Sequence, residues 1–517
     1  MKPPGTDLLL PDLTTPADVL AALSARLSLR EGAASERERR FYDTFDGLLR
    51  AAGFAFVHES GRSALVAIDG GSAQAGMAAA DPPERLVAAE LEPGALRDAL
   101  REIIDVRALL PLVRVHGAQR AFGVLDAGAK TVVRLALEEP AVVASPNRRL
   151  AMAPRVRLSA VRGYDKELAR VRATLIEDLG LRVADRSELD EAVLATGATP
   201  GGVSAKVDIA LAPDERTDLA VSSILGRLAE VMVANLPGTI ADVDPEFLHD
   251  YRVAVRRSRA VMKELKGVFP PEQLARFRVE LRWLQQVTGP SRDLDVYVLD
   301  FDELRSALAE PARSDLEPLL RVLRDRRAIA HREMVRELRS ERAAWLGAQW
   351  PAFLGDLITL PVENRPDATR AIGELSGERI VKVYRRMVKT GSAIEDSSPA
   401  ESLHELRKQG KELRYLLELF GLTLHPGDVV KPLVRALKSL QDTLGRHQDR
   451  EVQIATLRWL RDDVASRPGG PGALMAMGVL LEHLGRDERE ARAEFAQRFA
   501  AFASREQRPL VGETFGP

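Results

Sequence analysis

Residues 248–265 read LHDYRVAVRRSRAVMKEL, and residues 403–420 read LHELRKQGKELRYLLELF. A second matched pair follows just over thirty residues after each histidine: LRWLQQVTGPSRDLDVYV from residue 281, and LKSLQDTLGRHQDREVQI from residue 437. The two histidines are 155 positions apart, and Gly289 and Gly445 are 156 positions apart. A nearly constant offset over two matched segments indicates a duplicated helical unit.

The helical pattern extends over most of the second half of the chain. Apolar residues recur there at three- and four-residue spacing, and Gly- and Pro-containing breaks separate the segments. We predict an all-α domain over residues 214–505, made of two repeats at about 214–360 and 368–505, each with about four helices. Residues 506–517 are expected to form a tail.

The first half of the chain has a different pattern. Short β-compatible runs such as FAFVHES and KTVVRLALEE alternate with turns that contain Gly and Asp. We predict a β-rich antiparallel domain over residues 1–200 and a linker over residues 201–213. The expected fold class is therefore α+β with more than one domain.

The first segment of each repeat carries a row of basic side chains beside its apolar face. In the first copy five such residues fall within an arc of about 80° on a helix. Like charges at this spacing destabilise an isolated helix, so two matched rows predict an anionic partner. The alternative is a solvated face whose Arg and Lys stems cover apolar surface. The residues are His249, Arg252, Arg256, Arg259 and Lys263 in the first copy, and His404, Arg407, Lys411 and Arg414, with Lys408 at one flank, in the second.

The second segment of each repeat adds further candidates. Arg282 and Lys438 match each other, and Arg292 and His447 lie at the predicted glycine turns, where a helix N-terminus could also receive an anion. The matched residues Asp293 and Asp449 are expected to be N-caps or ion-pair partners that orient basic side chains. Lower-ranked candidates are Lys382, Arg385, Arg386, Lys389, Arg327 and His331.

The composition limits the classes of function. The chain has 74 basic and 76 acidic residues, so an anion site must come from local segregation of charge. It has no cysteine, which excludes disulfides, thiol catalysis and Cys-based zinc sites. Neither basic row has a second His or a carboxylate at ligand spacing on its own face, so we expect no bound metal. We also expect neither a transmembrane helix nor a secretion signal.

The paired helical segments resemble the CHAD family, the conserved-histidine α-helical domain. The resemblance covers residues 214–505 and includes both copies and their spacing. It implies two four-helix bundles related by a pseudo-twofold axis, with a basic central channel that binds inorganic polyphosphate. It also implies that the basic rows, with Arg282 and Lys438, line that channel and have no catalytic role and no cofactor. A cytoplasmic protein associated with polyphosphate granules is expected, and a homo-oligomer stays open.

The N-terminal half resembles a degenerate CYTH domain, the antiparallel β-barrel of the triphosphate tunnel enzymes. The supporting segments are FYDTFDGLLRAAGFAF from residue 41, AGAKTVVRLALEEPAV and RLSAVRGYDKELARV. We expect no counterpart of the family's Glu-x-Glu-x-Lys strand, since residues 27–37 read LSLREGAASER. Lys130 and Arg134 would be tunnel cations and Glu138 an acid. Because a two-metal phosphohydrolase needs clustered carboxylates, we do not expect catalysis.

Three other functions stay open. The basic helices could bind nucleic acid, but single-strand binders add stacking aromatics, and aromatic residues make up only 5% of this chain. Tyr251 is the single aromatic residue between the first and last cations of the first row. The N-terminal half could be a metal-dependent triphosphatase. Alternatively, the chain could be a scaffold whose N-terminal domain docks a partner.

Overall fold

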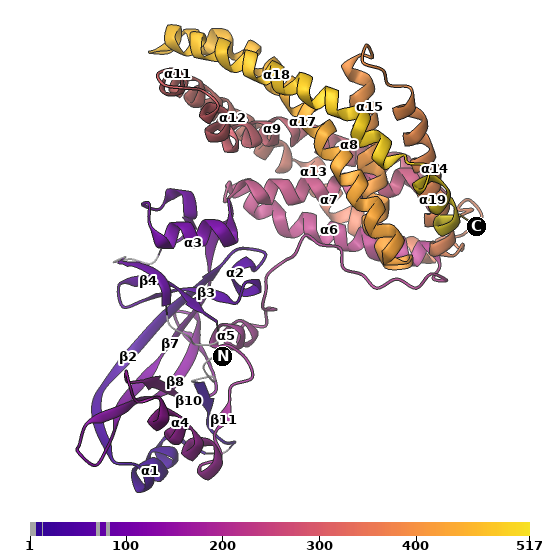
Figure 1. Cartoon of the computed structure of the whole chain (residues 1–517). Helices are drawn as coiled ribbons and strands as arrows, with labels where there is room; N and C mark the ends of the chain where they lie inside the picture. Colours follow the sequence, from indigo (N-terminus) through magenta and orange to yellow (C-terminus); the bar gives the residue numbers. More distant parts are fainter. Residues whose placement is uncertain (1–6, 13, 69–72, 79–82, 517) are drawn as a thin grey trace. The chain divides into compact units, whose positions relative to one another are not determined.

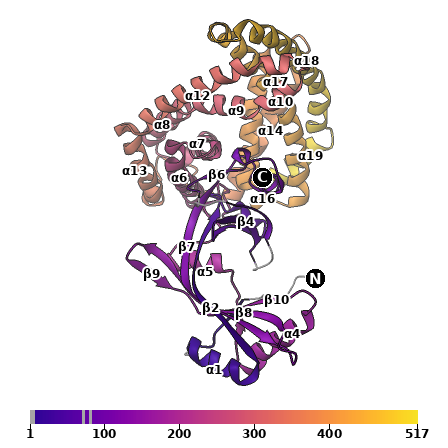
Figure 2. The ribbon, with the colours of Figure 1, turned by 90° about the vertical axis from the view of Figure 1, so that its left-hand side faces the viewer.

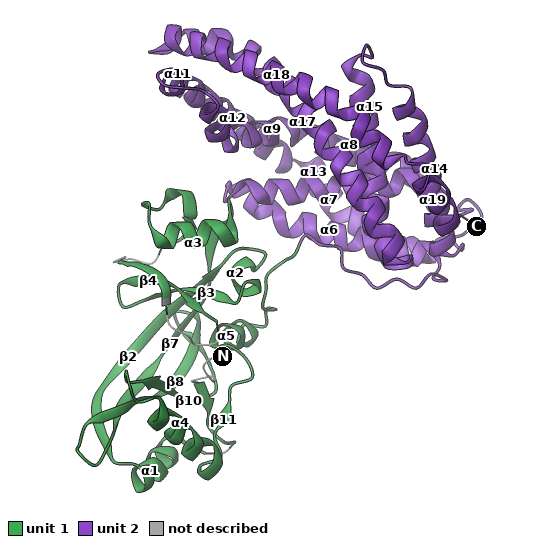
Figure 3. Ribbon diagram, in the orientation of Figure 1, with its two compact units in different colours: residues 1–204 green, residues 205–517 purple. Residues whose placement is uncertain are grey.

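The computed structural model describes residues 7–12, 14–68, 73–78 and 83–516. The chain divides into two compact units, residues 1–204 and residues 205–517 (Figure 3). The first unit is built on an antiparallel sheet and the second on helices, which confirms the predicted α+β class.

The first unit contains an eleven-stranded antiparallel sheet (Figure 1). The strand order is β11-β1-β10-β8-β7-β2-β3-β4-β5, with β6 paired to β7 and β9 paired to β8. The strands are β1 (Asp7–Leu9), β2 (Leu29–Asp43), β3 (Phe54–Glu59), β4 (Arg62–Ala67), β5 (Ala73–Ala78), β6 (Leu86–Val87), β7 (Ala108–Leu125), β8 (Thr131–Ser145), β9 (Arg148–Ala151), β10 (Arg155–Ala160) and β11 (Arg182–Val183). Figure 2 shows the length of β2 and β7, which pair side by side.

Short helices cover parts of this sheet and complete its apolar clusters. Leu23 of α1 and Val171 of α4 are buried in one cluster with strand residues such as Val133. Leu100 of α3 is buried with Phe56 in another, and Leu189 of α5 is buried in a third. The helices are α1 (Pro16–Arg26), α2 (Leu48–Ala51), α3 (Ala95–Ile104), α4 (Asp165–Ala173) and α5 (Glu188–Ala195).

The second unit is formed by helices of very different length. The longest, α17 and α18, run side by side (Figure 1). The helices are α6 (Thr217–Ala241), α7 (Pro245–Glu264), α8 (Pro271–Val287), α9 (Gly289–Leu299), α10 (Phe301–Ser306), α11 (Ala312–Asp315), α12 (Glu317–Leu338), α13 (Glu341–Asp356), α14 (Ile372–Ser392), α15 (Ala400–Leu416), α16 (Leu422–Leu424), α17 (Gly427–Ala465), α18 (Gly470–Phe502) and α19 (Gln507–Phe515).

The sequence repeat corresponds to repeated helices. The first matched segments form α7 and α15, and the second form α8 with α9 in one copy and α17 in the other. Leu248 and Val255 of α7 and Leu403 and Leu413 of α15 are buried in one common core. The two repeats therefore share a hydrophobic core.

The predicted glycine turn exists in the first copy alone. There the backbone is interrupted at Thr288, between α8 and α9, whereas α17 continues through Gly445 without a break. Pro290 lacks an N–H and its ring clashes with the preceding turn of a helix. The equivalent residue in the second copy is Arg446, which has neither restriction. The prediction of a turn at Gly445 is therefore wrong.

The segments expected as linker and tail are both packed against the helical core. Ala205, Val207, Ile209 and Leu211 alternate with more exposed residues, and their side chains pack on that core. Near the C-terminus, residues 507–515 form α19, in which Phe515 is 2% exposed. The expected unstructured tail is thus a docked helix over the residues that the structure describes.

Helix α6 is long and apolar enough, by length and composition, to cross a membrane. Its most apolar 18-residue window has a mean hydropathy of 1.5, and half of that window is buried inside the helical unit. Ile224 and Leu228 of this helix are 1% exposed and belong to the common core. Packing in that core accounts for the apolar character of α6.

Candidate functional site

The basic row of α7 begins next to a well-defined helix start. The side chain of Asp244 accepts a hydrogen bond from the backbone N–H of Glu246 at 2.9 Å, as an N-cap residue does. Leu248 and Val255 are buried on the adjoining face. The row therefore lies along the edge of the core, as the sequence predicts.

Arg252 is buried in the α7 row and is held by the next helix. Its Nη1 donates hydrogen bonds to the carbonyl oxygen of Gln285 at 2.9 Å and to Oγ1 of Thr288 at 2.7 Å. Burial, followed by the charge of Arg256, lowers the pKa of Arg252 to about 10. Arg252 is thus fixed in position before any ligand arrives.

The matched glycines lie against matched arginines. A Cβ atom at Gly289 would lie 3.7 Å from Nη1 of Arg252, and one at Gly445 would lie 3.5 Å from Nη2 of Arg407. The guanidinium groups therefore lie over a backbone that has no side chain at these positions. In α17 the glycine serves this close approach and not a turn.

The two basic rows converge at Arg256 and Lys411. Burial, followed by the charges of Arg407 and Arg256, lowers the pKa of Lys411 to about 8, and Arg252 of the first repeat contributes as well. The Nε atom of Arg256 is buried and has no hydrogen-bond partner. Within the described part of the chain, neither Arg256 nor Lys411 has a hydrogen bond or a close ion pair.

The matched aspartates accompany this cluster. Asp293 lies within electrostatic range of Arg252, Arg256 and Lys411, although burial raises its pKa against these cations. Asp449 lies 3.4 Å from Arg407, which confirms the predicted ion pair. The expectation of N-caps is wrong, because Asp293 is the fifth residue of α9 and Asp449 lies inside α17.

Each of the two matched histidines contacts the residue that precedes the matched aspartate. Nδ1 of His249 lies 3.0 Å from Nη2 of Arg292, and Nδ1 of His404 contacts Oε1 of Gln448. Because a guanidinium can only donate, Nδ1 of His249 is the acceptor and its ring proton is on Nε2. Arg292 also donates to the carbonyl oxygen of Pro245 at 3.0 Å, so it lies at the start of the α7 row, and anion binding by Arg292 stays a prediction.

Comparison with known families identifies the part of the chain that holds this cluster. The family model for the CHAD domain matches residues 223–458. Residues 223–458 form a CHAD domain. This match confirms the helical resemblance, whereas the CYTH-like resemblance of the first unit stays a prediction.

Curated relatives match part of the chain. Two uncharacterized proteins of Mycobacterium tuberculosis, from strains CDC 1551 / Oshkosh and H37Rv, are each 31% identical over 215 residues, which is 40% of this chain. The chain spans about two fifths of the length of these curated relatives, 38% in each case.

Two solved structures are also similar. The CHAD domain from the plant Ricinus communis is 24% identical with a TM-score of 0.48, covering 59% of this chain and 96% of that one. PptA from Streptomyces chartreusis is 18% identical with a TM-score of 0.42, covering 55% of this chain and 99% of that one.

Acidic side chains neutralise two predicted cations of the CHAD domain, one from the other repeat and one from the same repeat. Lys263 is ion-paired with Glu412 of α15, and Nε of Arg414 lies 2.6 Å from Oε1 of Glu418. Glu418 also accepts a hydrogen bond from Arg257 of α7 at 2.9 Å. The sequence places Glu418 one turn after Arg414, at the end of the second row, whereas the expectation of an unopposed charge at Lys263 is wrong.

The remaining predicted cations lie at the margin of the central cluster. Arg259 donates to Oε1 of Gln285 at 3.1 Å, and burial, then the charges of Arg282 and Arg278, lower its pKa. Arg282 is exposed beside it. Lys408 is exposed and lies 3.5 Å from Glu405, one turn earlier on α15. Lys438 is exposed on α17 in a groove against α18.

His447 does not belong to the cluster. It is 2% exposed, and its Nε2 and Nδ1 atoms lie 2.7 Å from Glu488 and 3.6 Å from Glu451. Since α17 is continuous, His447 is two residues, or about 200°, from Asp449, which faces the cluster. The prediction that His447 lies at a helix N-terminus and binds an anion is therefore wrong.

The lower-ranked candidates are mostly bound by other groups. Arg327 lies between Asp242 and Asp295, and Nε2 of His331 lies 3.0 Å from the carbonyl oxygen of Thr239. Arg386 is ion-paired with Glu412. The exposed residues of the set are Lys382, Arg385 and Lys389.

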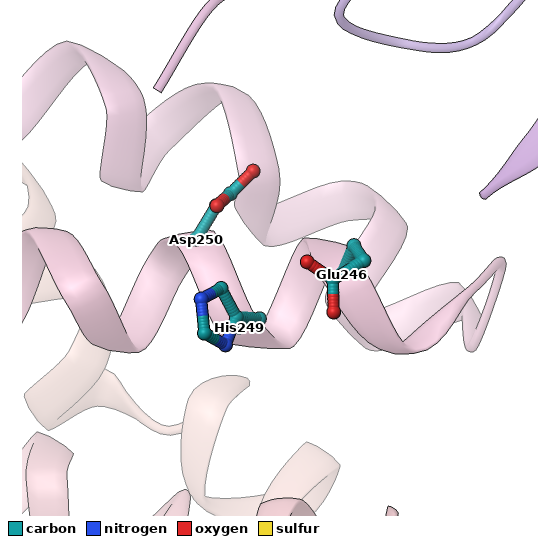
Figure 4. A group of neighbouring side chains, drawn as sticks. All are labelled: Glu246, His249 and Asp250. Carbon is teal, nitrogen blue, oxygen red and sulfur yellow. The ribbon is translucent and has the colours of Figure 1, made fainter. Parts of the chain in front are cut away.

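One group of side chains has the composition of a metal site. Ligand atoms of Glu246, His249 and Asp250 lie within 4.8 Å of one another at the start of α7 (Figure 4). Glu246 precedes His249 by three residues, so the expectation that the α7 row has no carboxylate at ligand spacing is wrong. Arg292 is 3.5 Å from Glu246 and 3.0 Å from His249. A fixed guanidinium at these ligand atoms repels a metal cation, so the group supports no metal site.

The first unit contains a separate charged cavity of about 1070 Å³. Glu138 is 3% exposed and is ion-paired with Arg37, Arg39 and Arg157. Glu188 pairs with Arg39 and Arg157 as well. The cavity therefore has many arginines, but its buried carboxylates already neutralise the innermost ones.

Sequence reasoning placed the cations of this unit incorrectly. Lys130 and Arg134 are exposed, whereas Arg37 and Arg39 line the cavity. Residues 36–40 read ERERR, so a Glu-x-Glu-x-basic pattern is present, and the expectation that it is missing is wrong. Side chains of a strand alternate between faces, and the glutamates of this pattern face outward, where Glu36 lies 3.5 Å from His116. The alternation of Glu and Arg over residues 36–39 is the sequence pattern that places Arg37 and Arg39 together on the cavity face.

Proposed function

We propose that the CHAD domain binds inorganic polyphosphate in the cleft where its two basic rows converge. CHAD domains are associated with polyphosphate binding. The observation that carries the proposal for this chain is the pair Arg256 and Lys411, which come from different repeats and have no close anionic partner among the described residues.

The energetics of this pair favour an anionic ligand. Burying a charge without a partner is unfavourable, and the lowered pKa of Lys411 is a direct consequence. A phosphate chain would supply several oxygens to guanidinium and ammonium groups at once. Arg252, already held by Gln285 and Thr288, would bind with little further loss of side-chain freedom.

The aromatic side chains argue for a phosphate chain over a single-stranded nucleic acid. Tyr251, which lies between the cations of the α7 row in sequence, is 4% exposed and faces the common core. It is therefore not available to stack on bases, which is the usual contribution of aromatics in single-strand binding. Nucleic-acid binding is retained as an outcome that the experiment below distinguishes.

A triphosphatase in the first unit is the second alternative. Its buried carboxylates, Glu138 and Glu188, are occupied by arginines. Metal-dependent hydrolysis needs carboxylates that can bind cations. The proposal therefore assigns ligand binding to the helical unit and no hydrolysis to the protein.

The test is titration of the full chain with polyphosphate, single-stranded RNA and triphosphate at several salt concentrations. The variant Arg256→Met/Lys411→Met keeps the apolar stems and removes both charges, and Arg332→Met/Arg458→Met removes two exposed charges elsewhere as a control. We expect polyphosphate affinity to fall steeply with salt, with a slope smaller by about 2 in the cleft variant. Equal affinity for RNA, or polyphosphate binding unchanged in the cleft variant, contradicts the proposal.

A further inference from the structure

A groove of about 470 Å³ lies between α17 and α18 and has an excess of positive charge. Four cations line it, against two carboxylates, Asp442 and Glu494. The cations are Arg435, Lys438 and Arg446 of α17 and Arg498 of α18.

The carboxylates do not neutralise all of these cations. Arg446 lies 2.7 Å from Glu494, and this contact lowers the pKa of the glutamate. Arg435, Lys438 and Arg498 have no hydrogen bond and no close ion pair with any described residue, and all three are exposed. The groove thus holds three cations without a close ion pair along two adjacent helices, and Arg498 lies within electrostatic range of Glu494.

The groove adjoins the cluster around Arg256 and Lys411. Lys438 precedes Gly445 by seven residues, which places the two within about 20° on the same side of α17. Gly445 lies against Arg407 of the central cluster. At the other boundary, Asp442 of the groove lies within electrostatic range of Arg414 on α15. The groove therefore begins where the row of α15 ends.

The equivalent positions of the first repeat carry fewer cations. Arg446 corresponds to Pro290 and Arg435 to Val279, so two of the four cations are missing there. The helix is also interrupted at Thr288, whereas α17 is continuous. Any extension of the central cleft along this route is therefore one-sided.

We propose that a phosphate chain held between Arg256 and Lys411 continues past Arg414 into the α17–α18 groove. This inference rests on the proposed function and specifies the ligand as a chain longer than the central cleft holds. From Arg435 to Arg446 the groove follows about 16 Å of helix at 1.5 Å per residue. Long chains then gain contacts that short ones do not reach.

The experiment compares tripolyphosphate with long-chain polyphosphate on the full-length protein. The groove variant is Arg435→Met/Lys438→Met/Arg498→Met, beside Arg256→Met/Lys411→Met and the control Arg332→Met/Arg458→Met. We expect the groove variant to bind tripolyphosphate as the unmodified protein does. For the long chain its affinity falls about tenfold, and its salt slope is smaller by about 2 to 3.

Two results separate the possible failures. If the groove variant keeps both the affinity and the salt slope for the long chain while the cleft variant loses them, the inference is overturned and the proposed function stands. If the unmodified protein binds neither ligand, both are overturned. The charge-preserving variant Arg435→Lys/Lys438→Arg/Arg498→Lys must bind the long chain as the unmodified protein does. If it also lost binding, the loss in the groove variant would not be due to the missing charges, and the inference would be overturned.

Discussion

Nη2 of Arg257 on α7 lies 2.9 Å from Oε2 of Glu418, in the π-helical turn Leu417–Gly421 that continues α15. At the repeat offset of 155 residues, Arg257 corresponds to Glu412 and Glu418 to Lys263. Glu412 and Lys263 form the second ion pair between the same two helices. The two ion pairs are therefore equivalent under the repeat. In both of them the first repeat supplies the cation and the second repeat supplies the acid.

Replacing Glu412 by Gln should change stability and ligand affinity in opposite directions. Glu412 is ion-paired with Lys263 and Arg386, so its loss should lower the free energy of unfolding by about 1 kcal/mol. The two cations released should raise polyphosphate affinity at low ionic strength, and screening should remove the gain at high salt. Urea unfolding and titration at two salt concentrations measure the two effects. A variant with unchanged affinity at low salt would show that Lys263 and Arg386 do not reach the ligand.

Polyphosphate affinity should decline as the pH rises through about 8. Burial and the charges of Arg407 and Arg256 lower the pKa of Lys411 to about 8, so the free protein loses this charge above that pH. A bound polyanion favours the charged lysine, so affinity is greatest below pH 8. Lys411→Arg, which stays charged throughout this range, should bind with no decline between pH 7 and 9. If the affinity of the Lys411→Arg variant declined with pH as that of the unmodified protein does, the decline could not be assigned to Lys411.

The same group affects stability with a definite sign. In the unfolded chain Lys411 should titrate near about 10.4. Between about pH 8 and 10 the unfolded chain binds more protons at this site than the folded one, so the contribution of Lys411 favours folding increasingly as the pH rises. Comparison of the unmodified protein with Lys411→Met over this range isolates that contribution. Without ligand, the free energy of unfolding of the unmodified protein should rise relative to that of Lys411→Met as the pH increases over this range.

Equivalent arginines should differ in their structural role. Arg252 is buried and bonded to Gln285 and Thr288, so Arg252→Met should lower the free energy of unfolding by about 1 to 3 kcal/mol. Arg407 pairs with the exposed Asp449, so Arg407→Met should lower it by about 0.5 kcal/mol. Both variants should weaken polyphosphate binding. Equal losses of stability would contradict the asymmetry between the repeats.

The sequence predicted the helical repeat and the rows of cations because both depend on local periodicity. The spacing of His249, Arg252 and Arg256 fixes their place on one side of a helix, whatever packs against it. Arg252, which lies against Gly289, and Arg407, which lies against Gly445, also occupy aligned positions in the two copies. The sequence alone therefore predicted that Arg252 and Arg407 are equivalent residues of the two repeats.

The acids that neutralise some of these cations depend on contacts between helices. Nothing in the α7 sequence shows that Glu412 and Glu418 of the other repeat reach Lys263 and Arg257. A glycine in a helical pattern also has two readings, and at Gly445 the close approach of Arg407 was the correct one. Because α17 continues through Gly445 without a turn, His447 lies on the side of the helix opposite to the site.

Glu138 should be the main electrostatic support of the first unit. Burial opposes its ionisation, yet the charges of Arg157, Arg39 and Arg37 hold its pKa below the usual value. Glu138→Gln leaves these arginines without their common partner and should cost about 3 kcal/mol of unfolding free energy at neutral pH. Because the folded pKa is lowered, the stabilisation is complete above about pH 4.5 and is lost as the pH falls below it. Glu139→Gln, on the exposed neighbouring residue, is the matched control and should have little effect.

In the proposed complex, the two basic rows hold one phosphate chain between them. The most direct measurement is a crystal structure of the full chain with polyphosphate, in which the phosphorus positions are located by difference density. The account predicts consecutive phosphates between Arg256 and Lys411, within hydrogen-bond distance of both. Phosphates bound solely in the cavity of the first unit, or on the outer faces of the helices with Arg256 and Lys411 uncontacted, would contradict it.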